Sequence, residues 1–262
     1  MTDPFESPAV ATRLYVETAL QGGQTLGLDH QRAHYLRSVL RLERGARIGV
    51  FNGHDGEWLA RIDGLGKGWA SLILEMQRRA PAPETDIHLI FAPVKRARID
   101  FLAEKATELG ASVLQPVFTQ HTDVTRVNTD RLAANAREAA EQCERLSVPE
   151  VRAPVAFQEL IAGWPTTRRL LLCAESGGAA PIADYLAGLD RASAGAEPWA
   201  IMTGPEGGFH TAELDALLKL PFVTTVGLGP RILRADTAAV SALACWQAWL
   251  GDGAARPPFR AG

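Results

Sequence analysis

The chain has 262 residues, of which 47% are hydrophobic and 22% are charged, and its formal net charge is −3. This length accommodates one large domain or two smaller ones, and the hydrophobic content is sufficient for packed cores. The slightly negative charge excludes a protein that coats nucleic acid through a general excess of cations, but it does not exclude a local basic patch.

The first 80 residues are predicted to be mainly β-structure. Short strands are expected at residues 13–16, 47–51, 57–62 and 69–75, separated by turns rich in glycine and aspartate. Between the first two strands, apolar residues at helical spacing predict an amphipathic helix over residues 30–42. These elements indicate a small barrel-like β unit with one helix.

A proline-rich segment at residues 80–84 marks the expected domain boundary, which gives domains at 1–80 and 85–262. After it, apolar runs alternate with helix-forming segments. Strands are expected at 87–94, 113–118, 170–174, 199–202 and 223–226, and helices at 99–109, 130–145, 182–186, 212–219 and 235–249. This alternation predicts an α/β domain with a parallel sheet.

The three cysteines, Cys143, Cys173 and Cys245, lie far apart and form no Cys-x-x-Cys pair. This pattern favours reduced thiols over disulfides or a zinc site, and we expect no bound metal. The sequence begins Met1-Thr2-Asp3-Pro4 without the basic and then apolar pattern of a secretory leader. No run approaches the roughly 18 apolar residues of a membrane span, so we expect a cytosolic protein without membrane contact.

Two glycine-rich turns in the last third of the chain are the most informative motifs. Gly204-Pro205-Glu206-Gly207-Gly208 and Gly227-Leu228-Gly229-Pro230 each follow an apolar run and precede a helix-forming segment. Strand, turn and helix in this order present backbone groups at the carboxyl edge of an α/β sheet. We therefore expect the two turns to form two walls of one pocket.

The composition of the turns limits their ligand. Neither has the glycine spacing of a dinucleotide fingerprint or a P-loop, and the carboxylate of Glu206 would repel a pyrophosphate. Pro205 and Pro230 each remove a backbone donor and leave carbonyl acceptors. Such loops suit an adenine amino group, ribose hydroxyls and a sulfonium, which makes S-adenosylmethionine a candidate ligand. The alternative is that the turns only connect elements.

Longer segments carry a family resemblance. Thr203–Phe209 together with Leu228–Ala238 resembles the knotted SPOUT methyltransferases and, within them, the ribosomal RNA small subunit methyltransferase E family. His34–Arg41, Lys105–Ala111 and Glu138–Arg145 resemble further segments of the same family, in the same order. Ordered matches over nearly the whole chain are more specific than either turn alone.

The resemblance implies a PUA-like amino-terminal β-barrel and a carboxyl-terminal α/β domain whose chain threads a deep trefoil knot. It also implies a homodimer, for which we expect the helix at 235–249 to supply part of the interface. S-adenosylmethionine would donate a methyl group to N3 of a uridine in 16S rRNA, as free RNA or in the small ribosomal subunit. One departure is Asp236, which stands where the family more usually has Glu; either residue suits a helix amino terminus.

Cofactor contacts are expected from both turns and the helix after them, including Thr237 as a helix cap: Thr203, Gly204, Pro205, Glu206, Gly207, Gly208, Gly227, Leu228, Gly229, Ile232, Leu233, Arg234, Thr237 and Ala238. Catalysis is assigned to Arg231, Arg234 and Glu206. The arginines would hold the uracil oxygens or a phosphate; the alternatives are that they are only solvated, or that they bridge to Asp236 or Glu206. Glu206 would bind the donor or remove the proton, and the alternative is that it only accepts hydrogen bonds that stabilise its turn. RNA contact is assigned to these residues: Arg32, His34, Arg37, Arg41, Lys95, Arg96, Lys105, Gln142 and Arg145.

Two other functions remain open from the sequence. A SPOUT enzyme could act on another RNA, such as tRNA, and a non-catalytic RNA-binding module could retain the pocket without turnover. A nucleotide-binding oxidoreductase is disfavoured because the dinucleotide fingerprint is missing.

Overall fold

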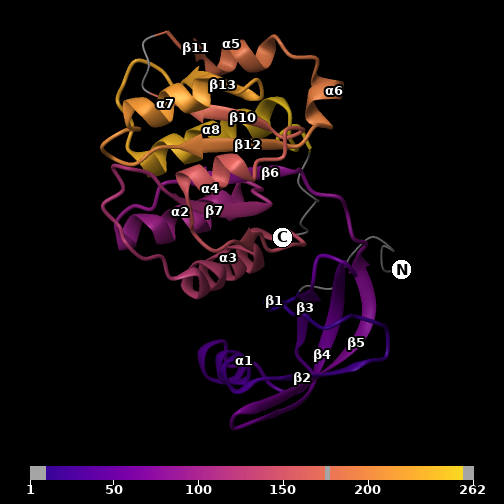
Figure 1. Cartoon of the computed structure of the whole chain (residues 1–262). Helices are drawn as coiled ribbons and strands as arrows, with labels where there is room; N and C mark the ends of the chain where they lie inside the picture. Colours follow the sequence, from indigo (N-terminus) through magenta and orange to yellow (C-terminus); the bar gives the residue numbers. More distant parts are fainter. Residues whose placement is uncertain (1–9, 175–177, 256–262) are drawn as a thin grey trace. The chain divides into compact units, whose positions relative to one another are not determined.

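The computed structural model describes residues 10–174 and 178–255. The chain divides into two compact units. The first comprises residues 10–83 together with Ala140–Val148, and the second comprises Glu84–Ala139 and residues 149–255 (Figure 1). The first division falls in the proline-rich segment, whereas the return of Ala140–Val148 to the first unit was not predicted.

The first unit contains a five-stranded sheet of order β1-β3-β4-β5-β2, in which β1 and β3 are parallel and the other pairs are antiparallel. The strands are β1 (Arg13–Tyr15), β2 (Thr25–Leu28), β3 (Arg47–Phe51), β4 (Glu57–Gly66) and β5 (Trp69–Arg79). The predicted strands are confirmed. The missed strand, β2, contains Gly27 and follows Gly22-Gly23, a composition that indicates a turn and not a strand.

The predicted helix of this unit is shorter than expected. It consists of α1 (His30–His34), capped by Asp29, and a π-helical turn, η1 (Tyr35–Val39). Arg41 has a φ of 55°, a left-handed conformation that cannot continue a helix, so the helix ends before residue 42. Ala33 and Leu36 are fully buried and pack into the apolar core between the helix and the sheet.

A buried ion-pair cluster explains why Ala140–Val148 belongs to the first unit. Glu57 is 1% exposed and pairs with Arg13 at 2.9 Å and with Arg78. The Arg13 guanidinium also donates hydrogen bonds to the carbonyls of Ala140 and Arg145, at 3.0 and 2.9 Å. Burial lowers the pKa of Arg13, and the charge of Glu57 opposes that effect.

The second unit is an α/β fold built on a parallel sheet of order β11-β13-β10-β12-β6-β7-β8, with the short β9 also paired to β7. Its strands are β6 (Ile87–Phe91), β7 (Val113–Phe118), β8 (Glu150–Val151), β9 (Val155–Ala156), β10 (Arg169–Cys173), β11 (Ala180–Pro181), β12 (Trp199–Thr203) and β13 (Val223–Gly227). Its helices are α2 (Arg96–Glu108), α3 (Thr129–Cys143, which ends in the first unit), α4 (Phe157–Ala162), α5 (Ile182–Ala187), α6 (Arg191–Gly195), α7 (Thr211–Leu218) and α8 (Ala235–Trp249).

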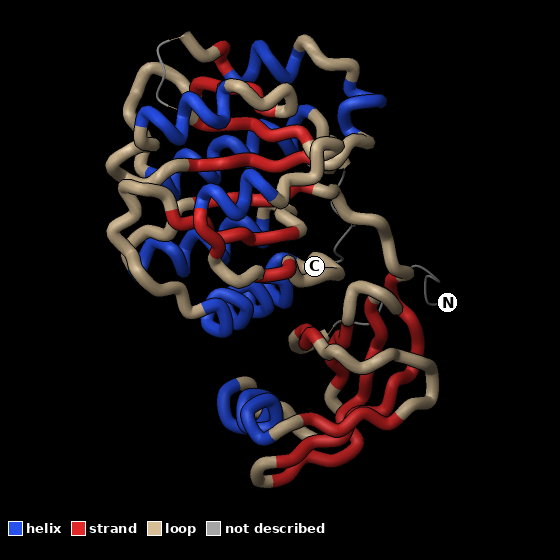
Figure 2. Tube along the Cα trace, viewed as in Figure 1, coloured by secondary structure: helices blue, strands red, loops and turns tan. Residues whose placement is uncertain are grey.

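Helices cover both faces of this sheet, as Figure 2 shows. Leu171 and Ile201 face a core completed by α2, α5 and α8, whereas Leu172 and Met202 face a core completed by α4 and α7. Burial on both faces is why these strands are continuous apolar runs in the sequence.

The main predicted strands and helices of this unit are confirmed, with ends that differ by a few residues. The missed elements, β8, β9, α4, β11 and α6, each have two to six residues. In the sheet, β10 lies between β12 and β13, so later strands insert among earlier ones. That order is compatible with the trefoil knot, which stays a prediction.

No helix in the described ranges is both long and apolar enough to cross a bilayer. Over those same residues, no cluster of three or more His, Cys, Asp or Glu side chains has an arrangement that could hold a metal ion.

Candidate functional site

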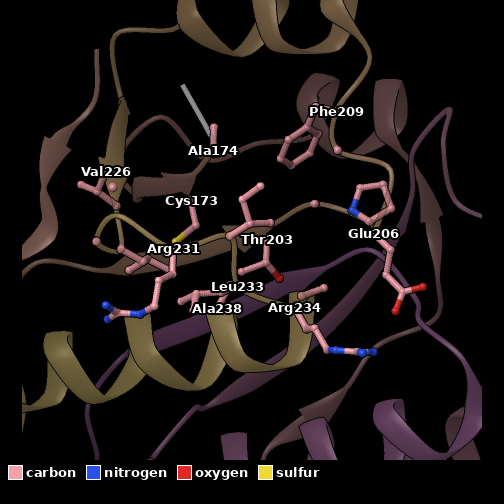
Figure 3. A pocket seen from close by; sticks show the side chains of 18 of the residues that line it. Cys173, Ala174, Thr203, Glu206, Phe209, Val226, Arg231, Leu233, Arg234 and Ala238 are labelled. Atoms are coloured by element: carbon pink, nitrogen blue, oxygen red, sulfur yellow. The ribbon is translucent and has the colours of Figure 1, made fainter. Parts of the chain in front are cut away.

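A pocket of about 800 Å³ opens at the carboxyl ends of β10, β12 and β13 (Figure 3). These parallel strands end together at Cys173, Thr203 and Gly227. Both glycine turns line the pocket, and the start of α8 adds Ala235 and Ala238. The prediction that the two turns form two walls of one pocket is therefore confirmed.

Most of the expected cofactor contacts lie on the pocket wall: Thr203, Gly204, Pro205, Glu206, Gly208, Gly227, Leu228, Gly229, Ile232, Leu233, Arg234 and Ala238, together with Arg231 from the catalytic set. Pro230 of the second turn also lines the pocket, as expected of that turn. The sequence missed other wall residues: Phe209, Leu214, Val226 and Ala235. Phe209 lies in the loop before α7, and Leu214 lies in the first half of α7. Only the folding of α7 against the sheet brings them to the pocket.

Gly207 and Thr237 are not on the pocket wall. A Cβ atom at Gly207 would lie 3.3 Å from Cβ of His121, so a side chain there would contact the loop after β7 and not fill the pocket. Thr237 does not cap α8, because the helix begins at Ala235. The Thr237 backbone N–H instead donates to the carboxylate of Asp236 at 2.9 Å. Asp236 thus lies in the first turn of α8, where a negative charge is stabilised.

The first turn has a conformation that requires glycine. The Gly208 N–H donates to the Pro205 carbonyl at 2.9 Å, and Gly208 has a φ of 72°. At Gly204 a Cβ atom would collide with the Phe209 ring at 2.9 Å. The chain then enters α7 through a capping box between His210 and Glu213. The Glu213 carboxylate also accepts from the Gln120 N–H at 2.9 Å, which anchors the turn to the loop after β7.

The hydroxyl of Thr203 lies on the pocket wall without a partner. Thr203 is 1% exposed, and its Oγ1 makes no hydrogen bond within the described structure. An unsatisfied buried hydroxyl destabilises a protein by about 1–3 kcal/mol. A ligand that hydrogen-bonds to this oxygen would recover that free energy, so the wall is chemically suited to a polar ligand group.

The charged side chains at the pocket divide into paired and unpaired groups. Glu206 accepts a hydrogen bond from Arg98 of α2 at 3.0 Å. Arg231 and Arg234 are exposed on the α8 side of the pocket (Figure 3), and their guanidinium groups make no hydrogen bond or ion pair with any other described residue. The bridges to Asp236 or Glu206 that would have made them purely structural are not formed. Both guanidinium groups are therefore available to an incoming anion or carbonyl.

Cys173 contributes an apolar wall and not a nucleophile. Burial, with a smaller contribution from Cys245, raises the pKa of the Cys173 thiol to about 12. At neutral pH the group is therefore an uncharged thiol.

The residues assigned to RNA contact are in different situations. His34 of α1, Arg37 of η1 and Arg41, just after η1, are exposed, and Arg32 pairs loosely with Asp29 at 3.8 Å. Lys95 and Gln142 are exposed as well. The Arg145 guanidinium bonds to Ser147 Oγ at 3.0 Å, and the side chain of Arg96 lies outside the described structure.

Lys105 is the least suited to RNA contact. Its ammonium group bonds to Glu104 and Glu108 at 2.7 and 2.8 Å, and these hydrogen bonds raise its pKa. The two carboxylates more than balance the lysine charge, so this part of α2 would not attract a phosphate.

The class of protein follows from two family models. Residues 81–247 match an RNA methyltransferase domain, and residues 28–75 match an RNA methyltransferase PUA domain. The protein thus combines an amino-terminal PUA domain with an α/β RNA methyltransferase domain, and the predicted fold class is confirmed.

The particular family follows from whole-chain relatives. Ribosomal RNA small subunit methyltransferase E of Rickettsia conorii is 32% identical over 88% of this chain and 93% of its own length. The crystal structure of the enzyme of that name from Neisseria gonorrhoeae, bound to S-adenosyl methionine, is 27% identical, with a TM-score of 0.80 over 92% of this chain and 98% of the other. A Legionella pneumophila methyltransferase in complex with the same cofactor is also 27% identical, with a TM-score of 0.77 over 90% and 97% of the two chains. This chain belongs to the ribosomal RNA small subunit methyltransferase E family.

Proposed function

We propose that this protein transfers the methyl group of S-adenosylmethionine to N3 of a uridine in 16S rRNA. The observation that carries the proposal is the single pocket between the two glycine turns, with the unsatisfied hydroxyl of Thr203 in its wall. Family membership and the two relatives crystallised with this cofactor support the choice of methyl donor.

The residues at the pocket fit the cofactor. Leu228, Ile232 and Leu233 supply apolar surface for an adenine ring, and Thr203 Oγ1 supplies an unused polar atom. Pro205 and Pro230 lack an N–H, so both turns are relatively rich in carbonyl acceptors for hydroxyl and amino groups. When bound, the cofactor supplies an electrophilic methyl group on a positively charged sulfur.

We assign Arg231 and Arg234 to binding the uracil that receives the methyl group. Uracil N3 carries a weakly acidic proton that must leave before or during methyl transfer, and negative charge then develops on O2 and O4. Preorganised donors aimed at developing charge are among the largest contributions to catalysis. The two unpaired guanidinium groups at the pocket are the side chains available for that role. Because the Glu206 carboxylate is bound to Arg98, we assign Glu206 to holding the turn in place and not to removing the proton.

Substrate RNA would be held by the PUA domain and by exposed cations outside the pocket. N3 of uracil is hidden in base pairs, so the target uridine must be unpaired or extruded. His34, Arg37 and Arg41 would contact phosphates and set the register of the RNA. We further propose a homodimer in the cytosol. Trp249 on α8 and Phe101 on α2 are each 43% exposed, and these two helices pack together, so they present apolar surface to a second copy.

Base-resolved mapping of modified RNA tests this function. A strain without the gene is expected to lose one N3-methyluridine in 16S rRNA, and the wild-type gene should restore it where an Arg234→Ala gene does not. If the strain keeps its methylated uridine in 16S rRNA but loses a modified base in tRNA, the substrate of the enzyme is tRNA. Calorimetry that detects no S-adenosylmethionine binding would leave only a non-catalytic RNA-binding role.

A further inference from the structure

An exposed tryptophan on the PUA domain is held flat against the sheet. Trp69 opens β5 and is 55% exposed, although tryptophan is a residue type that is highly buried on average. Its partner in the register of β4 and β5 is Gly66. A Cβ atom at Gly64 would lie 2.7 Å from the Trp69 ring, and one at Gly66 would overlap with it. The two glycines therefore leave room for the indole to lie on the backbone of β4.

This arrangement fixes one face of the ring and leaves the rest accessible. The Trp69 indole N–H donates no hydrogen bond to any other described residue. A ring held by backbone on one side loses little conformational entropy when a second flat group stacks on it. A nucleobase has a suitable π-face, and stacking on aromatic side chains is a common mode of single-strand binding.

Positive charge lies next to this ring. At Gly68, between Lys67 and Trp69, a Cβ atom would meet the His30 ring at 2.7 Å, so the tip of the hairpin touches the start of α1. Lys67 is exposed and forms no ion pair with the described residues. The exposed Arg37 lies in η1, which continues α1, and the exposed Arg41 lies two residues after the end of η1. The helix α1 packs against β5 (Figure 1). The negative charge of nearby Asp63 is balanced by Arg44 and Arg61, at 3.6 and 3.5 Å.

We infer that Trp69 is a stacking platform for one unpaired nucleobase of the RNA, flanked by phosphate-binding cations of the hairpin tip and of the segment that follows α1. The inference rests on the proposed function, because it takes RNA as the ligand. The structural alternative is that the indole only covers two glycines of β4, a known way to stabilise a glycine-containing strand.

The test uses the full-length protein and a fluorescein-labelled single-stranded RNA of mixed sequence, with the same RNA annealed to its complement as a comparison. Trp69→Leu keeps an apolar cover over the glycines but removes the π-face, and it is expected to weaken single-strand binding by about 5- to 100-fold. Trp69→Tyr should retain most of the affinity. Met76→Ala is the matched control, because Met76 is a 52% exposed apolar residue on the same strand, and it should bind like wild type.

Salt dependence and fluorescence make the test independent of stability. Trp69→Leu should lower affinity equally at every salt concentration, whereas loss of a phosphate contact would flatten the salt slope. If Trp69→Leu does not fold, Trp69→Tyr decides: RNA should quench tryptophan fluorescence less in this variant than in wild type. Unchanged quenching, an equal effect on duplex RNA, or wild-type affinity of Trp69→Leu with a lowered Tm would each overturn the inference.

Calorimetry with S-adenosylmethionine separates this inference from the proposed function. Wild-type protein that binds the cofactor but not single-stranded RNA would overturn the stacking platform and leave the methyl donor assigned. Trp69-dependent RNA binding without any cofactor binding would overturn the methyltransferase assignment and leave the platform intact.

Discussion

The two edges of the parallel sheet are made by the same strands but differ in how their polar groups are satisfied. At the amino edge, Arg168 donates to both oxygens of Asp86, at 2.8 and 2.9 Å, and to the Trp199 carbonyl at 2.8 Å. At the carboxyl edge, the hydroxyl of Thr203 and the guanidinium of Arg234 have no partner among the described residues. Polar groups that pair with one another hold strands together, whereas unpaired groups around a pocket are available to a ligand.

Each edge also carries an ion pair of nearly identical geometry. Arg98 and Glu206 are 3.0 Å apart with side chains 30% and 45% exposed, and Arg169 and Glu197 are 3.1 Å apart with side chains 31% and 44% exposed. Only the first touches the pocket. The second, in which Arg169 also donates to the Tyr185 hydroxyl at 2.7 Å, is therefore a control for the loss of an exposed carboxylate partner away from the pocket.

Arg234→Ala is expected to have the largest effect. It should lower turnover by about 100- to 1000-fold, since it removes a donor to developing charge on the uracil. The free energy of unfolding should change by less than about 0.5 kcal/mol, because the side chain is exposed and unpaired. Single-turnover methylation assays and urea denaturation measure the two quantities. If activity and stability fall together, Arg234 stabilises the fold and does not act on the substrate, and the carboxyl edge does not differ from the amino edge in this respect.

The amino edge should instead give the protein a pH-dependent stability. Burial, followed by the positive charge of Arg168, lowers the pKa of His88 from 6.5 to about 4. Between these values the unfolded chain binds more protons than the folded chain, so stability should fall as pH decreases from 6.5 towards 4. The contribution of His88 is about 2–3 kcal/mol at the lower end. Urea midpoints across this range should decline less steeply for His88→Leu, and identical slopes would refute the assignment.

Arg168→Ala should reverse the pattern expected for Arg234→Ala. It removes a bidentate partner from Asp86 and a donor from the Trp199 carbonyl, and it should lower the free energy of unfolding by about 2 kcal/mol. The affinity for S-adenosylmethionine, measured by calorimetry well below the midpoint of unfolding, should stay at the wild-type value. A weakened cofactor affinity in a fully folded variant would show that the two edges are coupled.

The two matched ion pairs should give the smallest difference. Glu206→Gln is expected to weaken cofactor binding about two- to fivefold, because it loosens the first turn, whereas Glu197→Gln should not change it. Both variants should lose at most about 1 kcal/mol of stability, the usual range for exposed pairs. A double-mutant cycle with Arg98→Ala tests whether Glu206 acts through Arg98. Additive effects would mean that the carboxylate acts without its partner.

Local patterns were enough to predict much of the fold and of the pocket. The run from Val113 to Phe118 and the helix from Ala235 to Trp249 were predicted with their observed bounds, because length and apolar periodicity define them without help from distant residues. The two glycine turns were also recognisable, because the left-handed conformations at Gly208 and Gly229 favour glycine, which is visible in the sequence.

Contacts between distant segments could not be predicted in this way. Arg98 reaches Glu206 across 108 positions, and Arg13 bonds to the Ala140 carbonyl across 127. Nothing in the sequence distinguishes these two paired arginines from Arg234, whose side chain is unpaired. Likewise Gly207 and Gly208 are adjacent glycines of one turn, yet only Gly208 lines the pocket while Gly207 lies against His121.

The amino-acid sequence by itself determined the family, the two kinds of domain and the two turns that bind the methyl donor in the proposed function, because each depends on short-range residue patterns. Only the tertiary structure decided which charges are neutralised, which hydroxyl is left without a partner and which side chains share a wall. Those properties depend on the order of strands in the sheet. That order brings β10, β12 and β13 together, although the chain visits them with other elements in between.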